Sequence, residues 1–509
     1  MIKNKKSLLI IVGILVLAAF FRLYDINSAP PGLYPDEAMN GNNVLVALET
    51  GDFQLFYPDN NGREGLFINI QALFIKFLGN HAWVLRMVSA IFGVLTVWGL
   101  YLLTKELFDK NIAYFSSFLL AISFWHVNFS RIGFRAIMLP FILVFGFYFL
   151  WKALKHGHLK YFIWSGIFWG LGFHTYISYR VAPLIVFVVL LNYWVYLRKD
   201  FSLSKYEHAK QQLFRGVVVM FACAALVLLP MLLYFLDNQD AFLTRSGEEL
   251  LVFSQESPLK ALMSSIVRTL GMFNFYGDTN WRHNISGSPQ LIWPIGGLFA
   301  IGFIKEFVHW LRKKHGHFST VHTLLFAWFF IMLLPGFLST EAPHALRALG
   351  AVPVVMIFAA KGLWWLYEKL HNWFIIYDPL QYRSHQKHLI LSSVLIIFLL
   401  SLSVVEFTRY FKIWAPRVSS NFNQEYVDIA QLINLLPNEL NKYIIVKRGG
   451  VPIKIPSDPD GRTLPMSTQT VMFLTDTFSY DKQMRKNVYY LTEEPLEDSI
   501  RDGAVFYIE

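Results

Sequence analysis

Residues 7–21, SLLIIVGILVLAAFF, form an unbroken apolar run directly after the basic start MIKNKK. The hydrocarbon core of a bilayer takes a helix of about 20 apolar residues, so this run with its flanks fits one membrane span. A signal peptide would look similar, but no small-x-small cleavage site follows the run, which favours an uncleaved first helix. With either interpretation, the segment that follows is expected on the exported side of the membrane.

The whole chain has a composition typical of a polytopic membrane protein. Hydrophobic residues make up 55% of its 509 residues, charged residues only 16%, and the mean hydropathy is +0.41, whereas soluble domains carry about 25% charged residues. Including the first run, we expect about eleven transmembrane helices and an all-α membrane domain. The ten further apolar runs lie at about 82–103, 111–127, 136–154, 160–178, 181–197, 214–236, 290–311, 319–339, 345–367 and 388–407.

The basic residues are distributed as the positive-inside rule requires. The chain has a net charge of +10, and its Lys and Arg clusters, such as TKELFDK and WLRKKHGH, fall on every second connection. This alternation predicts a cytoplasmic N-terminus. It also indicates that the positive charge faces the membrane surface and does not bind nucleic acid. The single cysteine, Cys223, excludes a disulfide framework or a thiolate metal site within one chain.

Two exported regions have structure of their own. In the first exported loop, about 23–81, the segments DEAMNGNNVLVALET and EGLFINIQALFIKFLG predict helices that end at Gly51 and Gly79. The last 100 residues or so are more polar, and predict a helix in NQEYVDIAQLINLL followed by strands in KYIIVKR, TVMFLT, NVYYLT and AVFYI. We therefore expect a membrane domain at 1–407 and a small extracytoplasmic α/β domain at 408–509.

An adjacent acid pair, Asp36 and Glu37, stands in the first exported loop within PPGLYPDEAMNGNN. Capping is one explanation, since Asp is a favoured N-cap and acids in a first turn complement the helix dipole. The same side of the membrane is, however, expected to carry several arginines in apolar or aromatic surroundings, against the positive-inside trend. Together they indicate an anion-binding cavity, because Arg recognises phosphate through two parallel hydrogen bonds.

The order of several segments resembles one enzyme family. The Asp-Glu pair, GREGLF, FSRIGFRAI, GDTNWRHN and HALRALGAVP are similar in order to the integral-membrane glycosyltransferases of the C-type fold, in the family 39 or protein-mannosyltransferase-like group. The lipid A aminoarabinose transferases belong to the same wider group. The resemblance covers roughly residues 8–405. Gly65 departs from the proline that bacterial members have in GREPLF.

This resemblance implies transfer of a sugar from a polyprenyl-phosphate donor to an acceptor hydroxyl on the outer face. It implies a single displacement with inversion, Asp36 as catalytic base, and Glu37 as its neighbour that orients it or binds acceptor or metal. Trp281, Tyr176 and Tyr179 are candidates for stacking on sugars. A divalent metal is possible, and the residues that could converge on it are His283, His344, Asp36 and Glu37. The candidates for the donor phosphate and other substrate contacts are Arg63, Arg131, Arg135, Arg282, His283, His344 and Arg347.

Other functions stay open on the sequence. A multi-pass transporter would use ionisable groups within its helices, and the expected helices hold almost no acids. Another polymerase or ligase of polyprenyl-linked glycans, or a non-catalytic lipid-binding scaffold, is a further alternative. The sugar is not identified, and the acceptor is a protein, a lipid or a glycan. The motifs point to a bacterial plasma membrane.

Overall fold

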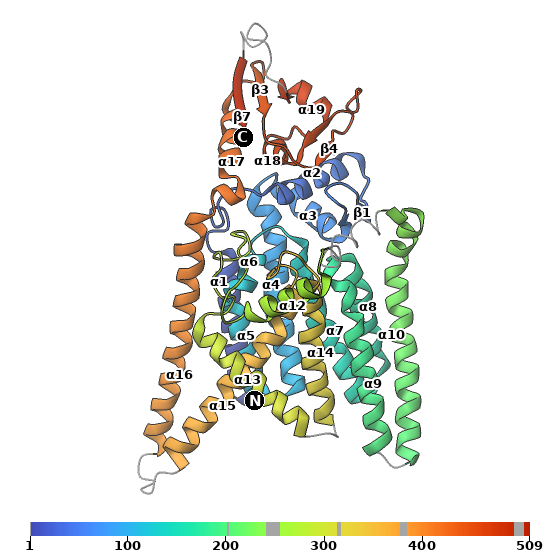
Figure 1. Ribbon diagram of the computed structural model, residues 1–509, viewed down its shortest axis with the longest axis vertical. Helices are drawn as coiled ribbons and strands as arrows, with labels where there is room; N and C mark the ends of the chain where they lie inside the picture. The colour runs from blue at the N-terminus through green and yellow to red at the C-terminus, as the bar shows by residue number, and fades with distance from the viewer. Residues whose placement is uncertain (1, 201–202, 241–254, 313–316, 377–383, 493–502) are drawn as a thin grey trace.

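A bundle of long helices forms most of the molecule (Figure 1). The computed structural model describes residues 2–200, 203–240, 255–312, 317–376, 384–492 and 503–509. Parts of the expected loop at 237–289 and of three basic connections therefore lie outside the described residues. The helices of the bundle are α1 (Ile2–Leu23), α4 (Ala82–Leu107), α5 (Lys110–Ile122), α7 (Met138–His156), α8 (Leu159–Leu171), α9 (Pro183–Asp200), α10 (Leu203–Asp237), α13 (Trp293–Arg312), α14 (His317–Phe337), α15 (Val352–His371) and α16 (Ser384–Phe407).

Each expected span coincides with one of these helices, but they differ in length and polarity. Within the described residues, eight helical segments are long and apolar enough to cross a membrane. The other three expected spans are shorter or more polar: α5 and α8 have 13 residues each, and α13 holds the adjacent charges Lys305 and Glu306. All three nevertheless pack within the bundle, α5 on α4, α8 on α7 and α13 on α15 (Figure 1).

Two buried acids lie in the described part of the bundle, and both belong to apolar runs identified in the sequence. Glu306 contacts His322 at 2.9 Å and Lys361 at 3.2 Å. Glu406 contacts Arg409 at 3.2 Å. Burial of a carboxylate is costly unless it is paired, and both acids have their partners.

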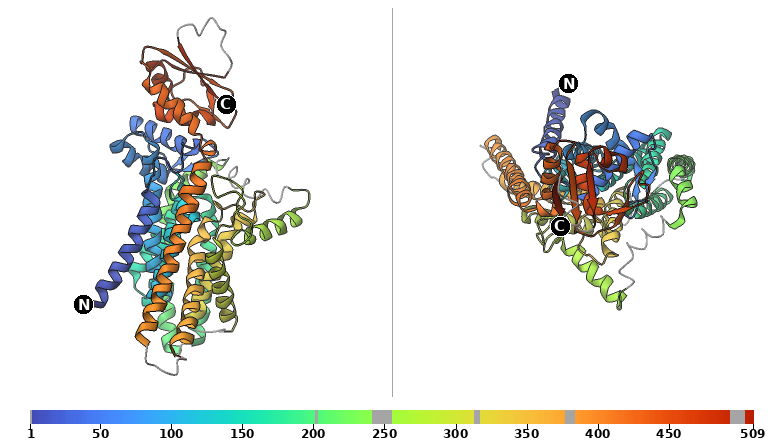
Figure 2. Two further views of the ribbon diagram at one scale, coloured as in Figure 1. Left: turned by 90° about the vertical axis from the view of Figure 1, so that its left-hand side faces the viewer. Right: turned by 90° about the horizontal axis from the view of Figure 1, so that it is seen from above.

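Shorter elements connect these helices. The helix α6 (Phe124–Phe129) follows α5, and α12 (Pro258–Gly271) precedes α13 and projects sideways from the bundle (Figure 2, left). Short 3₁₀ helices lie at Arg135–Ile137, Gly172–His174, Ile177–Val181, Leu349–Ala351, Ala415–Arg417, Ser420–Phe422 and Met466–Thr468. Two π-helical segments lie at Asn372–Ile376 and Thr408–Trp414.

The first loop between bundle helices folds as the sequence predicts, with one addition. Its two helices are α2 (Pro35–Thr50), ended by Gly51 in the left-handed conformation, and α3 (Gly65–Leu78), ended by Gly79. Between them, β1 (Phe56–Tyr57) and β2 (Arg63–Glu64) form a small antiparallel hairpin. Both helices lie across one end of the bundle, beneath the C-terminal part of the chain (Figure 1).

The C-terminal part is a small α/β unit. The helix α17 (Gln424–Leu435) precedes a parallel sheet in the order β6-β3-β7. The remaining elements are two short paired strands and two helices. The bounds are β3 (Asn441–Val446), β4 (Pro452–Lys454), β5 (Thr463–Pro465), α18 (Gln469–Thr475), α19 (Tyr480–Arg485), β6 (Val488–Leu491) and β7 (Gly503–Ile508).

One predicted strand is wrong. TVMFLT, residues 470–475, is part of the helix α18 and not of a sheet. A short apolar run with no alternation does not distinguish a buried strand from a buried helix. Met472 and Phe473 are both fully buried, and α18 packs between α17 and α2. Contacts on two sides therefore favour a helix here.

The C-terminal unit packs directly on α2. Asn42 donates a hydrogen bond to the Gln469 side chain at 2.9 Å, and the Thr470 hydroxyl donates to the Leu33 carbonyl at 2.8 Å. Lys482 forms an ion pair with Glu49 at the far end of α2. These contacts fix the unit against the segment that carries the acid pair.

Candidate functional site

A polar cavity of about 220 Å³ opens beside the start of α2. Asp36, half-buried in the first turn of α2, lines it together with Asn60 of the hairpin turn and Tyr176. The Asp36 Oδ1 atom accepts a hydrogen bond from Asn60 Nδ2 at 2.7 Å. The carboxylate is therefore held at the cavity wall by one hydrogen bond among the described residues.

Two arginines face the same cavity. Arg63 on β2 is buried and donates to the side-chain oxygens of Asn40 and Asn43 on α2. Arg135 pairs through Nε with Glu64 Oε2 at 2.6 Å, and its buried Nη2 atom has no hydrogen-bond partner within the described structure. The Arg135 guanidinium lies 5.8 Å from the centre of the Tyr176 ring. The cavity thus combines one carboxylate with two guanidinium groups.

Glu37 points away from this cavity, into the protein. It is fully buried, as is Arg86 of α4, and Arg86 Nε lies 3.0 Å from Glu37 Oε2. The Gly133 amide donates to the same oxygen at 2.7 Å, and Arg86 also donates to the carbonyls of Pro30 and Gly32 at 2.7 Å. Glu37 therefore joins three segments of the chain and does not face the cavity as the expected neighbour of the base would.

Arg131 also lies outside the cavity. It is fully buried and donates to the backbone carbonyls of Phe21, Asp25 and Ala29. Its guanidinium lies 4.8 Å from the Phe411 ring centre. All these contacts fix the end of α1 against neighbouring segments, and Arg131 is not among the residues that line the Asp36 cavity.

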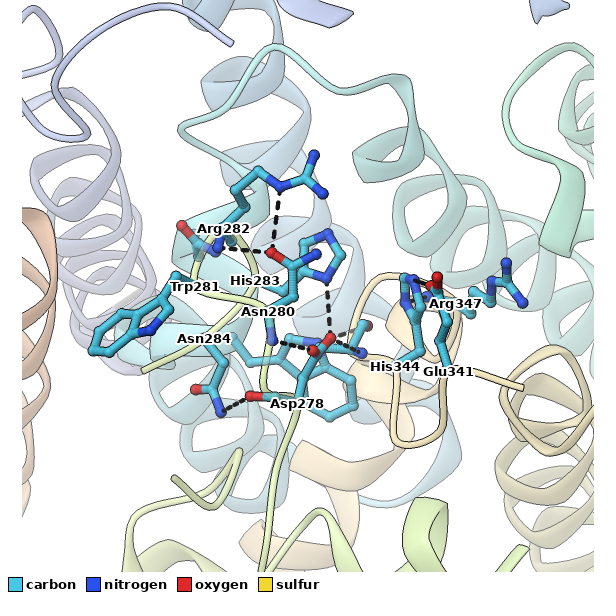
Figure 3. Close-up of polar contacts among 12 residues, drawn as sticks. Asp278, Asn280, Trp281, Arg282, His283, Asn284, Glu341, His344 and Arg347 are labelled. Carbon is cyan, nitrogen blue, oxygen red and sulfur yellow. Dashed lines mark hydrogen bonds and ion pairs between the residues drawn. The ribbon is translucent and has the colours of Figure 1, made fainter. Parts of the chain in front are cut away.

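A second polar group gathers around Asp278, which the sequence reading had not singled out (Figure 3). Asp278 Oδ2 contacts His283 Nδ1 at 3.0 Å and accepts from the Ala345 amide at 2.7 Å, and Oδ1 accepts from the Asn280 amide at 2.8 Å. Asp278 thereby ties the GDTNWRHN loop to the segment before α15. The His283 and His344 rings lie 5.0 Å apart.

These three side chains are also the group, within the described residues, that could hold a metal ion. One potential ligand atom each from Asp278, His283 and His344 lies within 4.8 Å of the others. Burial opposes ionisation of Asp278, but the hydrogen bond and charge of His283 outweigh it and lower the pKa of the carboxyl. Burial, with the nearby His283, lowers the pKa of His344 well below its usual value. Carboxylate and neutral imidazole are the forms that bind divalent metals. The structure does not bring Asp36 and Glu37 into this group.

The remaining predicted residues lie around these two centres. Arg282 stacks over the Tyr34 ring at 4.3 Å, and Arg347 donates from Nη1 to the Ser339 hydroxyl. Trp281 is half-buried, and its carbonyl accepts from Trp414 Nε1 at 2.7 Å. Tyr179 is fully buried with its hydroxyl on the Trp169 carbonyl, so of the three expected stacking rings only Tyr176 lines the cavity.

An apolar groove lies beside the polar cavity. It has a volume of about 540 Å³, and its walls come from α10 and the segment after α8. Glu64 and Arg180 are the charged residues in its lining, and Glu64 is the partner of Arg135 in the polar cavity. The residues of this groove could not be identified from the sequence, because the leucines of α10 are equally consistent with lipid-facing positions. The apolar residues that line the groove are Phe173, Leu228, Met231, Leu232, Phe235 and Leu236.

The sequence is similar to known proteins over part of its length. Residues 66–209 match the family described as dolichyl-phosphate-mannose-protein mannosyltransferase. Two proteins of Bacillus subtilis (strain 168), both named as mannosyltransferases, are similar: YkcB, 25% identical over 201 residues, and YycA, 27% identical over 209 residues. The matches cover 37% and 39% of this chain, and only 27% and 29% of those proteins.

Solved structures are similar over nearly the whole chain. The oligosaccharyltransferase of Archaeoglobus fulgidus, solved with a tethered acceptor peptide, has a TM-score of 0.57 at 14% identity, covering 94% of this chain and 64% of that one. ArnT from Cupriavidus metallidurans, solved with undecaprenyl phosphate, has a TM-score of 0.53 at 14% identity, covering 94% and 87%. The chain therefore has the C-type glycosyltransferase fold that its sequence predicted.

Proposed function

We propose that this protein is a membrane glycosyltransferase, which moves a sugar from a polyprenyl-phosphate donor to an acceptor hydroxyl at the outer face of the membrane. One observation carries the proposal. A polar cavity with a carboxylate and two guanidinium groups adjoins an apolar groove, and the Glu64–Arg135 pair stands between them. A donor with an apolar tail, a phosphate and a sugar needs these environments in this order.

The apolar groove and the polar cavity bind different parts of the donor. The apolar groove takes part of the polyprenyl chain, where each buried CH₂ contributes about 0.8 kcal/mol. The phosphate then lies near Arg135, whose unpartnered Nη2 supplies a donor, and Arg63 adds a second charge. Undecaprenyl phosphate in the ArnT structure and a dolichol-phosphate in an oligosaccharyltransferase structure support a lipid phosphate as the carrier.

The reaction is a single displacement with inversion. The acceptor oxygen forms a bond to the anomeric carbon as the bond from that carbon to the phosphate oxygen breaks. Polyprenyl phosphate leaves, and the acceptor proton passes to the Asp36 carboxylate. Guanidinium groups fixed before the reaction stabilise the negative charge that grows on the leaving phosphate. A second carboxylate, as in retaining glycosidases, is not required.

Among the sequence candidates, we assign Asp36, Arg63, Arg135 and Tyr176 to the cavity where the sugar is transferred. Glu37 and Arg131 support the surrounding backbone. If a divalent metal binds, Asp278, His283 and His344 would hold it, and it would supply positive charge beside the end of the bundle that carries Asp36. Arg347 lies near His344, and we propose that it contacts the substrate on the side from which the acceptor enters.

The arrangement in the membrane follows from the same proposal. The N-terminus is cytoplasmic, and residues 408–509 form an extracytoplasmic domain above the acid pair. The membrane is a bacterial plasma membrane, and the acceptor arrives from the side of that domain.

The proposal is tested by offering the full chain in lipid vesicles a set of polyprenyl-phosphate sugars, with cell-envelope extract as the source of acceptor. We expect one donor to be consumed, with polyprenyl phosphate released and label transferred. Nuclear magnetic resonance of the product should show the anomeric configuration opposite to that of the donor. Retention of configuration would contradict the single displacement, and consumption of no donor would contradict the enzyme.

A further inference from the structure

A second polar cleft lies between the C-terminal unit and the segment before α2. Its volume is about 300 Å³. Tyr34 and Pro35 form one wall, immediately before Asp36, and Arg282 borders it from the GDTNWRHN loop. The opposite wall belongs to the C-terminal unit and includes Asn423, Arg448 and Ser467. The cleft and the Asp36 cavity therefore lie on either side of one short stretch of chain.

This cleft carries two positive charges, those of Arg282 and Arg448. Arg282 stacks on Tyr34 and donates to Asn280, and Arg448 donates to the Tyr426 hydroxyl at 3.3 Å. Within the described residues, neither guanidinium pairs with a carboxylate. By contrast, Arg462 at the surface of the same unit forms an ion pair with Asp458 at 2.9 Å. The charge of the exposed Glu425 acts on Arg448 without an ion pair between the two side chains. Two guanidinium groups at one cleft, neither in direct contact with a carboxylate among the described residues, favour an anionic ligand.

Tyr34 links the two arginines to Asp36. Burial raises the pKa of the Tyr34 hydroxyl and the charge of Asp36 raises it further, whereas Arg282 and Arg448 act in the opposite direction. All three charges thus act on a single hydroxyl. A ligand held by the arginines would lie close to the residue that carries the proposed base.

Contacts within and behind the walls fix the cleft. The Ser467 hydroxyl donates to the Arg448 carbonyl at 3.1 Å, which holds the loop that carries this arginine. Gly32 has a φ of +73°, and a methyl group there would overlap the Phe422 carbonyl, so the backbones of the two walls approach closely. The ordering cost of binding is lower when the donors are already in place.

We propose that this cleft binds a phosphate group carried by the acceptor, and so presents the acceptor hydroxyl to Asp36. The proposal rests on the proposed function and gives its acceptor a chemical class. Two guanidiniums with the side-chain amide of Asn423 offer more donors than a carboxylate can use, and a phosphate accepts them through several oxygens. The volume fits a head group the size of glycerol phosphate or one sugar phosphate.

The test measures binding of radiolabelled glycerol 3-phosphate to the detergent-solubilised full chain. Arg448 is exposed, so Arg448→Gln should fold normally, and Arg485→Gln, an exposed arginine on α19 of the same unit, is the matched control. Loss of a charge-assisted hydrogen bond predicts binding about 10- to 100-fold weaker for Arg448→Gln. Arg448→Lys should recover part of the affinity, and the control should equal wild type. Equal affinity for wild type and Arg448→Gln would overturn the proposal, as would absence of saturable binding.

Competition then separates the two sources of the phosphate. Displacement of the probe by phosphatidylglycerol vesicles, and not by phosphatidylcholine vesicles, assigns the cleft to a lipid head group. Displacement by soluble glycerol-phosphate oligomers alone assigns it to a polymer.

Failure of this site and failure of the enzyme give different results. If the wild type transfers sugar and Arg448→Gln transfers it equally well at low acceptor concentration, the phosphate cleft is wrong and the transferase stands. If the wild type binds the probe through Arg448 but consumes no donor, the cleft stands and the transferase is wrong.

Discussion

Asp36 and Glu37 are adjacent in the sequence and have opposite surroundings. Successive side chains on a helix point about 100° apart, so one faces the cavity while the other faces the interior. Asp36 is half-buried and bonded to Asn60, whereas Glu37 is fully buried against Arg86 and the Gly133 amide. A carboxylate that is to accept a proton from a substrate needs access to it, and only Asp36 has that access.

This difference predicts opposite effects of the two substitutions on stability. Glu37→Ala leaves the Arg86 charge buried without its carboxylate partner, which costs about 3–5 kcal/mol. The melting temperature of the purified protein in detergent should fall by several degrees. Asp36→Asn is the matched control and should melt with the wild type. A Glu37→Ala protein as stable as wild type but unable to transfer sugar would instead make Glu37 catalytic.

Single residues were the part of the site that the sequence predicted least well. The pair and the arginines were noticeable because charges are rare in an apolar chain. Their partners were not: Arg86 occurs singly in an apolar helix, and Asp278 lies within GDTNWRHN, where the adjacent Arg282 and His283 drew the attention. Whether an arginine faces a cavity, as Arg135 does, or binds backbone carbonyls, as Arg131 does, depends on how distant segments pack and is not encoded in local spacing.

At the scale of elements, glycines let two helices of the bundle approach closely. A methyl group on Gly302 of α13 would overlap the Phe358 carbonyl of α15, and one on Gly362 of α15 would overlap the Leu298 carbonyl of α13. Inside a membrane the hydrophobic effect does not drive helices together, and small residues stabilise helix pairs by letting their backbones pack closely. The α13–α15 contact therefore depends on both glycines.

Gly302→Ala should destabilise the protein, by about 1–3 kcal/mol if it follows other overpacked sites. Gly297 lies on the same helix with nothing within 4 Å of an added methyl, so Gly297→Ala is the control and should be neutral or slightly stabilising. Thermal unfolding of the two variants beside wild type makes the comparison. An equal fall in melting temperature for both would show that the substitution acts through something other than the α15 contact.

Long elements were predictable because apolar runs of membrane length have few alternative structures. The helices α4, α10 and α16 are examples. Short buried elements were less so. The segment TVMFLT predicts a strand, but so short an apolar run also fits the helix α18, and only its contacts with α2 and α17 decide between the two. The residues that contact both faces of such an element come from distant parts of the chain.

At the scale of the whole molecule, the C-terminal unit and α2 share one core. Met39 of α2 packs among the buried residues of that unit, and α2 lies between it and the bundle (Figures 1 and 2). Removing the unit would therefore expose α2 as well as the acceptor cleft. For this reason, single substitutions such as Arg448→Gln test its role more cleanly than a truncation.

The proposed orientation predicts which surfaces a membrane-impermeant maleimide reaches in intact cells. In a Cys223→Ser background, Asp460→Cys in the C-terminal unit should be labelled, because that unit is outside. Asn111→Cys at the start of α5, also exposed, should be labelled only after the cells are opened. The reverse pattern would place the acid pair in the cytoplasm and remove the basis for transfer at the outer face.

The central claim is that Asp36 removes the proton from the acceptor during transfer. The most direct test is sugar transfer from the polyprenyl-phosphate donor by wild type and Asp36→Asn in lipid vesicles, at equal protein and with donor binding measured in parallel. The account predicts transfer lower by about 10²–10⁴-fold for Asp36→Asn, with donor binding unchanged. Equal transfer by the two proteins would contradict it and would reduce Asp36 to a residue that stabilises the start of α2.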